Sequence, residues 1–399
     1  MKKLISIMLS TLLAMSTAAC SSGSAGTASS GAAAGGASAA VSAPSSAAAA
    51  SSAAAQAGGK KKAGVCWYQF SDTFIANARQ SLLNIAQSDG KISVADADST
   101  NDQNVQANNM NNFFSQKVDY LVLNNINMGG ISNIVDQCKQ KGVTAIFANT
   151  TSPADKDFSN YDKLWYVSSD SRQSGTNMGN AIAEYIKAHP NTWDRNHNGK
   201  LDFVLLQGIA SFSDTINRSS YSLAAIEGAG TKLGKCIGGD DVTGVKGGDS
   251  VNGVICGFSR AKAQENVEAL LANYGKDIDC VIADNDDEAL GAIAALKAHG
   301  YFTNESNTIP VVGVDATAAG CEALKNGTML ETSLNNPVKL SKCVYKVMSL
   351  LNDGKEVNTQ SLGIDGAKVE GHRVWIDYTS ITAKNISDAS YDIKDTKIN

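Results

Sequence analysis

Residues 64–86 read GVCWYQFSDTFIANARQSLLNIA, and this stretch decides the fold class. It begins with a short apolar run, Gly64 to Tyr68, which is typical of a strand buried on both faces of a sheet. The apolar residues that follow are spaced for one face of a helix; they are Ile75, Ala78, Leu82, Ile85 and Ala86. A buried strand followed by an amphipathic helix is the repeating unit of parallel α/β folds.

The same alternation continues along the rest of the chain. Further apolar runs that predict buried parallel strands lie at 120–123, 144–147, 203–206, 280–283, 311–314 and 329–334. Helical patterns separate these runs, which indicates βαβ units and doubly wound sheets. The part after the N-terminal segment is long enough for two domains of ordinary size. The sequence therefore predicts an α/β fold of two doubly wound parallel-sheet lobes.

The N-terminus carries the pattern of a bacterial lipoprotein signal. A cationic Met1-Lys2-Lys3 precedes the apolar run 4–15 and a small-residue cleavage site that ends in Cys20. We predict that residues 1–20 are a signal peptide and that Cys20 is lipidated, because the apolar run is shorter than the roughly 20 residues needed to span a bilayer. The Ser/Ala/Gly-rich residues 21–62 predict a disordered linker. The protein is thus expected outside the cytoplasm, anchored to the membrane by lipid.

Composition and charge limit the partners. With 34 basic and 39 acidic residues, the net charge of −5 gives no electrostatic reason to expect nucleic acid.

Eight cysteines include Cys20, so the remaining seven cannot all pair within the chain. Cys236 and Cys256 bracket a glycine-rich segment, and in an extracytoplasmic protein they could form a disulfide or stay free.

Short polar side chains recur where the apolar runs end. In open α/β sheets ligands bind beyond the carboxyl ends of the strands, and the residues at these points are Asp72, Asn124, Asp214, Asn285, Asp315 and Asn335. Each alone is a normal helix N-cap or turn former, but their recurrence favours a polar cleft. Arg218 lies one helical turn after Asp214. The set is net negative and suits a neutral polyol, against which Phe74 and Phe258 could lie flat if they are not core residues.

Several motifs together resemble the bacterial glucose/galactose-binding proteins, which are receptors of sugar ABC transporters. They are 64–74, 98–103, 123–124, 203–208, Asp214 with Arg218, 283–286, 313–315 and 334–335. The resemblance implies the type I periplasmic-binding-protein fold, with three crossings joining the lobes. We expect an N-terminal lobe from 63–143 plus 336–372 and a C-terminal lobe from 144–335 plus 373–399.

The resemblance also implies roles for individual residues. Hydrogen bonds to sugar hydroxyls would come from Asp72, Asn124, Asp214, Arg218, Asn285, Asp315 and Asn335, with Phe74 stacking on one face. Phe212 stands where the family has a histidine donor, and Phe258 stands where it has a stacking tryptophan. Phe258 keeps an aromatic surface, whereas Phe212 removes a hydrogen bond, so selectivity between glucose and galactose stays open.

The segment Asp194 to Asp202 has the spacing of a calcium-binding loop. Oxygen side chains occupy positions 1, 3, 5 and 9 with glycine at position 6; the predicted ligands are Asp194, Asn196, Asn198, the Lys200 carbonyl and Asp202. An EF-hand would have a glutamate at position 12, where this chain has Leu205. The resemblance implies that Asp279 supplies that carboxylate instead, so we expect bound Ca²⁺. A polar turn without metal is the alternative.

Taken together, these features predict a monomeric binding protein rather than an enzyme. It would bind a neutral, glucose- or galactose-like hexose and deliver it to an ABC transporter permease by closing its lobes. Presentation of the sugar to a chemoreceptor or sensor kinase is an alternative. A carbohydrate-active enzyme would use two of the aspartates as its carboxylate pair. A sugar-responsive repressor would need an N-terminal helix-turn-helix, where this chain has a lipoprotein signal.

Overall fold

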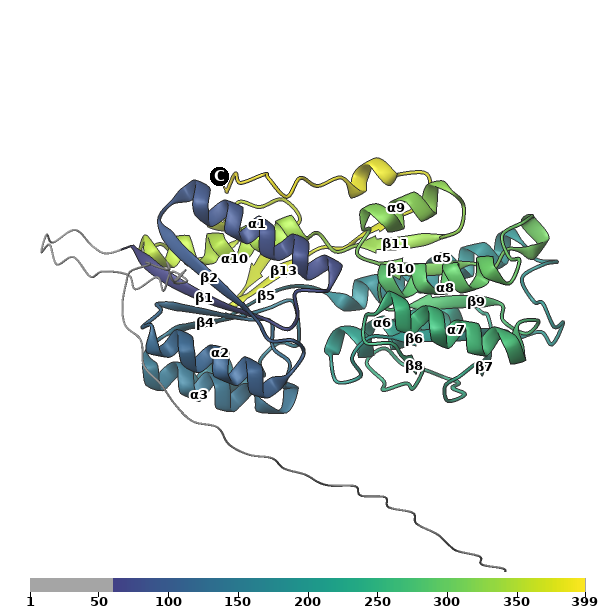
Figure 1. The fold of residues 1–399 in the computed structure, drawn as a ribbon, viewed down its shortest axis with the longest axis horizontal. Coiled ribbons are helices and arrows are strands. Elements are labelled where there is room, and N and C mark those ends of the chain that lie inside the picture. The colour runs from purple at the N-terminus through teal and green to yellow at the C-terminus, as the bar shows by residue number, and fades with distance from the viewer. Residues whose placement is uncertain (1–59, 399) are drawn as a thin grey trace, which may run out of the picture. The chain divides into compact units, whose positions relative to one another are not determined.

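The computed structural model describes residues 60–398, which Figure 1 shows as a ribbon. The predicted signal peptide, Cys20 and nearly all of the predicted linker lie outside the described residues. The linker was predicted to reach residue 62, but the first strand, β1 (Lys61–Trp67), already begins at Lys61. Lys61 and Lys62 pair with Ile92 and Ser93 of the neighbouring strand. Exposed lysines at the end of a strand do not form an apolar run. The sequence pattern therefore places the end of the linker too far along the chain.

The first sheet has seven strands in the order β12-β13-β5-β4-β3-β1-β2. Besides β1 they are β2 (Ile92–Asp98), β3 (Tyr120–Leu123), β4 (Thr144–Ala148), β5 (Leu164–Ser169), β12 (Ala367–Glu370) and β13 (Arg373–Ile376). All pairs are parallel except β12 with β13. Figure 1 shows α1 (Thr73–Asp89) and α10 (Pro337–Asn352) on one face, and α2 (Gln103–Ser115) and α3 (Ile131–Lys141) on the other. Two short helices, α4 (Asp155–Asn160) and α11 (Thr359–Leu362), lie in its connections.

The second sheet follows the order β14-β11-β10-β9-β6-β7, with β8 also paired to β6. Its strands are β6 (Leu201–Gln207), β7 (Leu233–Cys236), β8 (Val254–Ile255), β9 (Cys280–Ala283), β10 (Val311–Val314), β11 (Glu331–Leu334) and β14 (Thr379–Ile381). Its helices are α5 (Ser171–Ala188), α6 (Ser213–Gly228), α7 (Arg260–Tyr274), α8 (Asp286–Ala298) and α9 (Ala318–Lys325). All seven strands predicted from apolar runs are therefore present in one sheet or the other.

The two sheets define two lobes, and residues 61–389 cross between them three times. Lobe 1 is built from residues 61–169 and 337–376, and lobe 2 from 171–335 and 379–389. The crossings lie at residue 170, near residue 336 and at 377–378. This confirms the predicted α/β fold of two parallel-sheet lobes. The predicted boundary at 143/144 is wrong, because β4 and β5 pair within the first sheet. The boundary at 372/373 is also wrong, since β13 pairs with β5.

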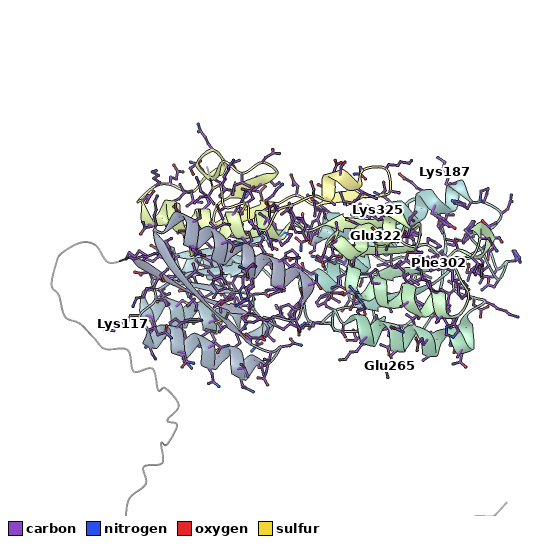
Figure 2. The ribbon with its side chains drawn as sticks, turned by 45° about the horizontal axis from the view of Figure 1, so that its top comes forward. Lys117, Lys187, Glu265, Phe302, Glu322 and Lys325 are labelled. Atoms are coloured by element: carbon purple, nitrogen blue, oxygen red, sulfur yellow. The ribbon has the colours of Figure 1, made fainter. Side chains whose placement is uncertain are left out.

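The periodicity of α1 shows how the sequence builds these layers. Its predicted apolar stripe is buried from Ile75 to Ala86, and the helix ends at Gly90, whose φ of 73° is left-handed. Charged side chains point outward, as Glu322 and Lys325 on α9 do in Figure 2. No helix of the described residues is long and apolar enough to cross a membrane.

Seven cysteines lie in the described part of the chain, and all are free thiols. Cys236 and Cys256, the possible disulfide pair, are both buried. The Cys236 thiol lies 3.9 Å from the Asn252 carbonyl oxygen, and the Cys256 thiol lies 3.5 Å from that of Val254. In this structure the glycine-rich segment between them is therefore held by packing and backbone hydrogen bonds rather than by a covalent bridge.

A C-terminal segment, residues 390–398, runs from lobe 2 back to lobe 1 and is drawn in yellow in Figure 1. Tyr391 packs on the core of lobe 2, and its hydroxyl accepts a 3.3 Å hydrogen bond from Asn77 of α1. Further on, the Ile393 carbonyl accepts from Asn84, and Asp395 pairs with Lys342 of α10 at 2.7 Å. This segment is a connection between the lobes in addition to the three crossings.

Candidate functional site

A small cavity lies where the carboxyl ends of strands from both lobes meet. It encloses about 30 Å³. The residues that line it are Tyr68, Asp72, Phe74, Asn149, Phe212, Asp214, Arg218, Phe258, Asn285, Asp315 and Asn335. Nine of the ten predicted site residues are thus brought together from distant parts of the sequence. This position agrees with the general rule for ligand sites in open α/β sheets.

Asn124 is the predicted site residue that does not line the cavity. It is fully buried, its Oδ1 accepts from the Tyr68 amide at 3.3 Å, and its Nδ2 donates to the Ala148 carbonyl at 3.2 Å. Asn124 therefore links the ends of β1, β3 and β4. The sequence pattern placed it correctly at a strand end, but the direction of its side chain depends on the neighbouring strands.

Two lining residues, Tyr68 and Asn149, were absent from the predicted set. Asn149 directly follows the apolar run of β4, so the rule that selected the other residues could have found it. Tyr68 was counted as the end of the first strand. Its hydroxyl donates to Asp72 Oδ2 at 2.5 Å, so its ring and its polar group both belong to the site.

The polar lining side chains are held at helix and strand ends. Asp72 and Asn285 are the N-caps of α1 and α8, and their Oδ1 atoms accept from the amides of Ile75 and Glu288 at 2.9 Å. Asp315 follows β10 with a φ of 111°, an unusual backbone conformation for a residue other than glycine. The caps fix the side chains of Asp72 and Asn285 at the cavity edge, and the second oxygen of Asp72 accepts the hydrogen bond from Tyr68.

Burial governs the charge state of the site. It raises the pKa of the Asp72, Asp214 and Asp315 carboxyls above their ordinary values, and the positive charge of Arg218 opposes this effect at Asp214 and Asp315. Arg218 itself donates to the Asp284 carbonyl at 2.8 Å and to the Tyr378 hydroxyl at 3.1 Å. A carboxyl group that keeps its proton can donate as well as accept, which suits a ligand with many hydroxyl groups.

Four of the lining residues are aromatic. Tyr68 meets Phe212 edge to face, with ring centroids 5.8 Å apart, and Phe212 lies 6.4 Å from Phe258 at a tilted angle. Phe212 is only 2% exposed. With Phe74, these rings add apolar surface to a cavity that polar side chains also line.

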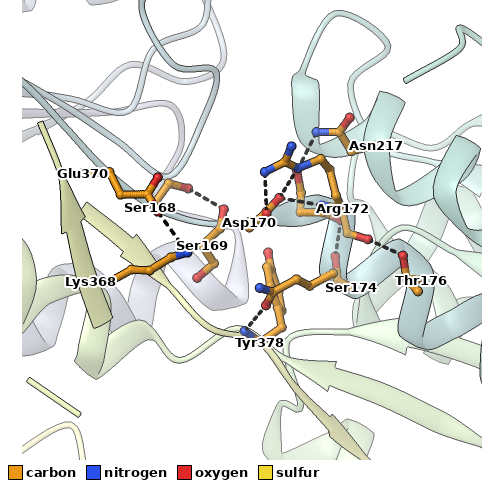
Figure 3. Close-up of polar contacts among 12 residues, drawn as sticks. Ser168, Ser169, Asp170, Arg172, Ser174, Thr176, Asn217, Lys368, Glu370 and Tyr378 are labelled. Carbon is orange, nitrogen blue, oxygen red and sulfur yellow. Dashed lines mark hydrogen bonds and ion pairs between the residues drawn. The ribbon is translucent and has the colours of Figure 1, made fainter. Parts of the chain in front are cut away.

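The crossings between the lobes contact the site directly. Ser169, beside the first crossing, donates to the lining residue Asn335 at 2.9 Å. Asp170 pairs with Arg172 at 2.7 Å, and Figure 3 shows Tyr378 of the third crossing near this pair. The Tyr378 amide donates to Gln173, and its hydroxyl accepts from Arg218. A change in lobe angle would therefore alter contacts around Arg218 and Asn335.

The predicted calcium ligands also lie together, around Asp202. Both Asn196 and Asn198 donate their side-chain amides to Asp202 Oδ2, at 2.6 and 2.7 Å. Asp279 accepts from the amides of Arg195 and Asp202, each at 2.8 Å. The donor set is all oxygen, as calcium prefers, but in this arrangement the two asparagine amide nitrogens face the carboxylate. No cluster of three His, Cys, Asp or Glu side chains placed to hold a metal occurs among residues 60–398.

Comparison with known proteins identifies the family. A family model described as "Periplasmic binding protein domain" matches residues 63–356, so the chain belongs to this family. The D-galactose/methyl-galactoside binding periplasmic protein MglB of Haemophilus influenzae is 28% identical over 82% of this chain and 91% of its own length. The xylitol-binding protein of Mycolicibacterium smegmatis is 26% identical over 75% of this chain and 74% of its own.

Solved structures show the same fold. An ABC transporter solute binding protein from Bacillus halodurans with bound myo-inositol has a TM-score of 0.64 and 24% identity, over 84% of this chain and 98% of that one. A galactofuranose binding protein has a TM-score of 0.65 and 19% identity, over 82% of this chain and 97% of that one. At these identities the match establishes the architecture, and the ligand must be argued from the site.

Proposed function

We propose that this protein binds a neutral monosaccharide outside the cytoplasm and delivers it to an ABC transporter permease. The observation that carries the proposal is the cavity, which is lined both by carboxyl, amide and guanidinium groups and by aromatic rings. Polar groups of this kind can hydrogen-bond the hydroxyl groups of a sugar, and aromatic rings can cover its C–H face. Relatives named for galactose and xylitol binding support a polyhydroxylated ligand.

Lobe movement is part of the proposal. A cavity of about 30 Å³ holds water rather than a sugar. A sugar can therefore enter only when the lobes separate and the side chains rearrange. Thr73 of lobe 1 donates to Asp287 of lobe 2 at 2.7 Å, so the present contact between lobes includes polar groups that can separate and meet again.

The proposal also concerns which sugar the protein binds. We favour a glucose- or galactose-like hexose because Asp72, Asp214, Arg218 and Asn285 stand in the order implied by the resemblance. Phe212 departs from that pattern, so a sugar lacking a hydroxyl at the position facing Phe212 is the competing ligand.

Calorimetric titration of the full chain with neutral hexoses, pentoses and polyols tests whether a neutral sugar binds and whether it is a hexose. Binding of at least one neutral sugar with release of no product is the expected result. Binding of charged ligands alone would contradict the proposal, and turnover of a glycoside would favour the enzyme alternative. Presentation of the sugar to a chemoreceptor or sensor kinase would use the same site.

We also propose that Ca²⁺ binds the loop from Asp194 to Asp202 together with Asp279. Three carboxylates and two amide oxygens would surround the ion once Asn196 and Asn198 turn their oxygens inward. The ion would tie the loop to the strand region at Asp279. Removal of calcium by EDTA should lower the melting temperature of the full chain, and adding calcium back should restore it. Unchanged melting, with no metal found by elemental analysis, would leave the loop as a polar turn.

A further inference from the structure

The backbone of Phe258 is held in an unusual conformation. Phe258 lies in the turn between β8 and α7, and its φ is 59°, in the left-handed region that glycine favours. Gly257 before it has a φ of 64°. Ser259 after it caps α7 by accepting from the Lys262 amide. A phenylalanine keeps such a conformation only where its surroundings hold it.

Gly208 makes the first contact that holds Phe258 in this conformation. A Cβ atom on Gly208 would lie 2.0 Å from Phe258 Cζ, so the ring packs directly against the glycine backbone. Gly208 follows β6, and its amide donates to Asp284 Oδ2 at 3.2 Å. The absence of a side chain at Gly208 therefore makes the space that the Phe258 ring fills.

Glu288 makes the second contact that holds Phe258 in this conformation. This residue of α8 is fully buried, and its Oε1 accepts a 2.9 Å hydrogen bond from the Phe258 amide. Its Oε2 has no hydrogen-bond partner among the described residues. Burial raises the pKa of Glu288 well above its ordinary value, and the nearby Asp284 adds to the effect. Glu288 does not line the cavity. Burying a carboxyl group is costly unless it is hydrogen-bonded, and here the Phe258 amide supplies that bond to Oε1 alone.

We propose that Glu288 is a positioning residue for sugar binding, which holds the Phe258 amide so that the ring lies against Gly208 and faces the ligand cavity. The inference rests on the proposed function and deepens it, because a fixed ring at Phe258 favours ligands that present an apolar C–H face. The carboxyl acts on the sugar through Phe258 and does not touch it.

The first test compares two substitutions of Glu288 by calorimetry, using the sugar that binds best to the full wild-type chain. Glu288→Met removes the acceptor and should weaken binding about fivefold, the size expected for a misplaced aromatic contact. Glu288→Gln keeps an acceptor and should restore wild-type affinity. Equal affinity of wild type and Glu288→Met would overturn the proposal.

Glu331 offers a matched control. It is also a fully buried glutamate of lobe 2 whose Oε2 lacks a partner among the described residues, but it lies in β11 and contacts Ser333 and Ser380 rather than the cavity lining. Glu331→Met should lower stability without weakening sugar binding. If it weakens binding as much as Glu288→Met does, the effect of Glu288 is general destabilisation and the proposal fails.

A double-mutant cycle separates an effect through Phe258 from any other. In a Phe258→Ala background, Glu288→Met and Gly208→Ala should cause no further loss of affinity, because both act through the missing ring. Additive losses would overturn the proposal. Gly208→Ala in the wild-type background should weaken binding as Glu288→Met does, which provides a second variant if Glu288→Met does not fold.

Fluorine NMR without sugar distinguishes failure of this inference from failure of the proposed function. In protein labelled with fluorophenylalanine, the Phe258 resonance is identified by its loss in Phe258→Leu. It should shift in Glu288→Met and stay in place in Glu331→Met. If that result holds while no sugar binds the wild type, the positioning contact stands and the proposed function falls. An unmoved resonance in Glu288→Met overturns the positioning role.

Discussion

At the scale of single residues, the site depends on buried carboxyl groups. Burial costs free energy when these groups are charged, and the positive charge of Arg218 and the hydrogen bonds at the helix caps offset part of that cost. Asp315 is 6% exposed, and the charge of Arg218 and a side-chain hydrogen bond with Asn335 favour its ionised form. A sugar hydroxyl would replace the water that such a group needs. Loss of this carboxyl should therefore cost more in binding than in folding.

Asp315→Ala should weaken sugar binding by about 10- to 150-fold, because leaving the buried partners of this carboxyl unsatisfied costs roughly 1.5–3 kcal/mol. Asp72→Ala should weaken binding at least as much, and it should also lower the melting temperature because Asp72 caps α1. Calorimetry and thermal melts separate the two effects. Asp162→Ala, at an exposed position of lobe 1, is the control. Wild-type affinity in both site variants would place the ligand elsewhere.

Phe212→His should change selectivity rather than abolish binding. Phe212 is buried against Tyr68, so a histidine there would keep a flat ring and add a donor at the cavity. We expect the ratio of affinities to move towards glucose or galactose and away from sugars lacking a hydroxyl at that place. A competition titration with both kinds of sugar measures the ratio. An unchanged ratio would show that Phe212 does not face the discriminating hydroxyl.

The raised pKa of Glu331 gives a prediction of how the free energy of unfolding varies with pH. Burial raises the pKa of Glu331 from 4.5 to about 8, while hydrogen bonds from Ser333 and Ser380 oppose this and the charge of Asp286 adds to it. Between these values the folded protein retains a proton that the unfolded chain releases. The free energy of unfolding should therefore fall as pH rises from 4.5 to 8, by at most about 1.4 kcal/mol per pH unit from this group. In Glu331→Gln the fall should be smaller, as urea unfolding at several pH values would show; an identical slope would contradict the assignment.

At the scale of elements, the helices bring their N-termini to the site, and the C-terminal segment ties the lobes together. The segment holds lobe 2 through Tyr391 and lobe 1 through Ile393 and Asp395. Lys346 adds a 2.7 Å hydrogen bond to the Ile398 carbonyl. Separation of the lobes must stretch or release some of these contacts.

Truncation after Tyr391 should therefore favour the open arrangement. Exposed ion pairs contribute at most about 1 kcal/mol, which corresponds to about a fivefold weaker sugar affinity if the contacts form only when the lobes are closed. Lys342→Met, which removes the ion pair alone, should have a smaller effect in the same direction. Dissociation rates measured by stopped flow test this. Wild-type rates in the truncated protein would show that the segment follows the lobes without restraining them.

At the scale of the whole molecule, the folded part is expected to work while tethered. Cys20 lies outside the described residues, so lipidation stays a prediction from the signal pattern. Cys20→Ser should abolish lipid labelling and release the protein from the membrane fraction, while the melting temperature of the folded part stays unchanged. Membrane association and labelling equal to wild type would contradict it.

The sequence by itself determined the alternation of strands and helices and most of the cavity lining. Buried parallel strands are continuous apolar runs, and polar residues must follow them where ligands bind, so both signals are local. Asp72, Asp214 and Asp315 could be selected on that basis before their positions in space were known.

Only the tertiary structure decided which strand joins which sheet and which way a polar side chain points. β4 and β5 look the same in sequence whichever lobe they enter, because pairing partners are distant along the chain. Asn124 and Asn149 both follow apolar runs, yet neighbouring strands use the hydrogen bonds of Asn124 and leave Asn149 in the cavity. The contact of Glu288 with Phe258 joins residues 30 positions apart and has no local signal.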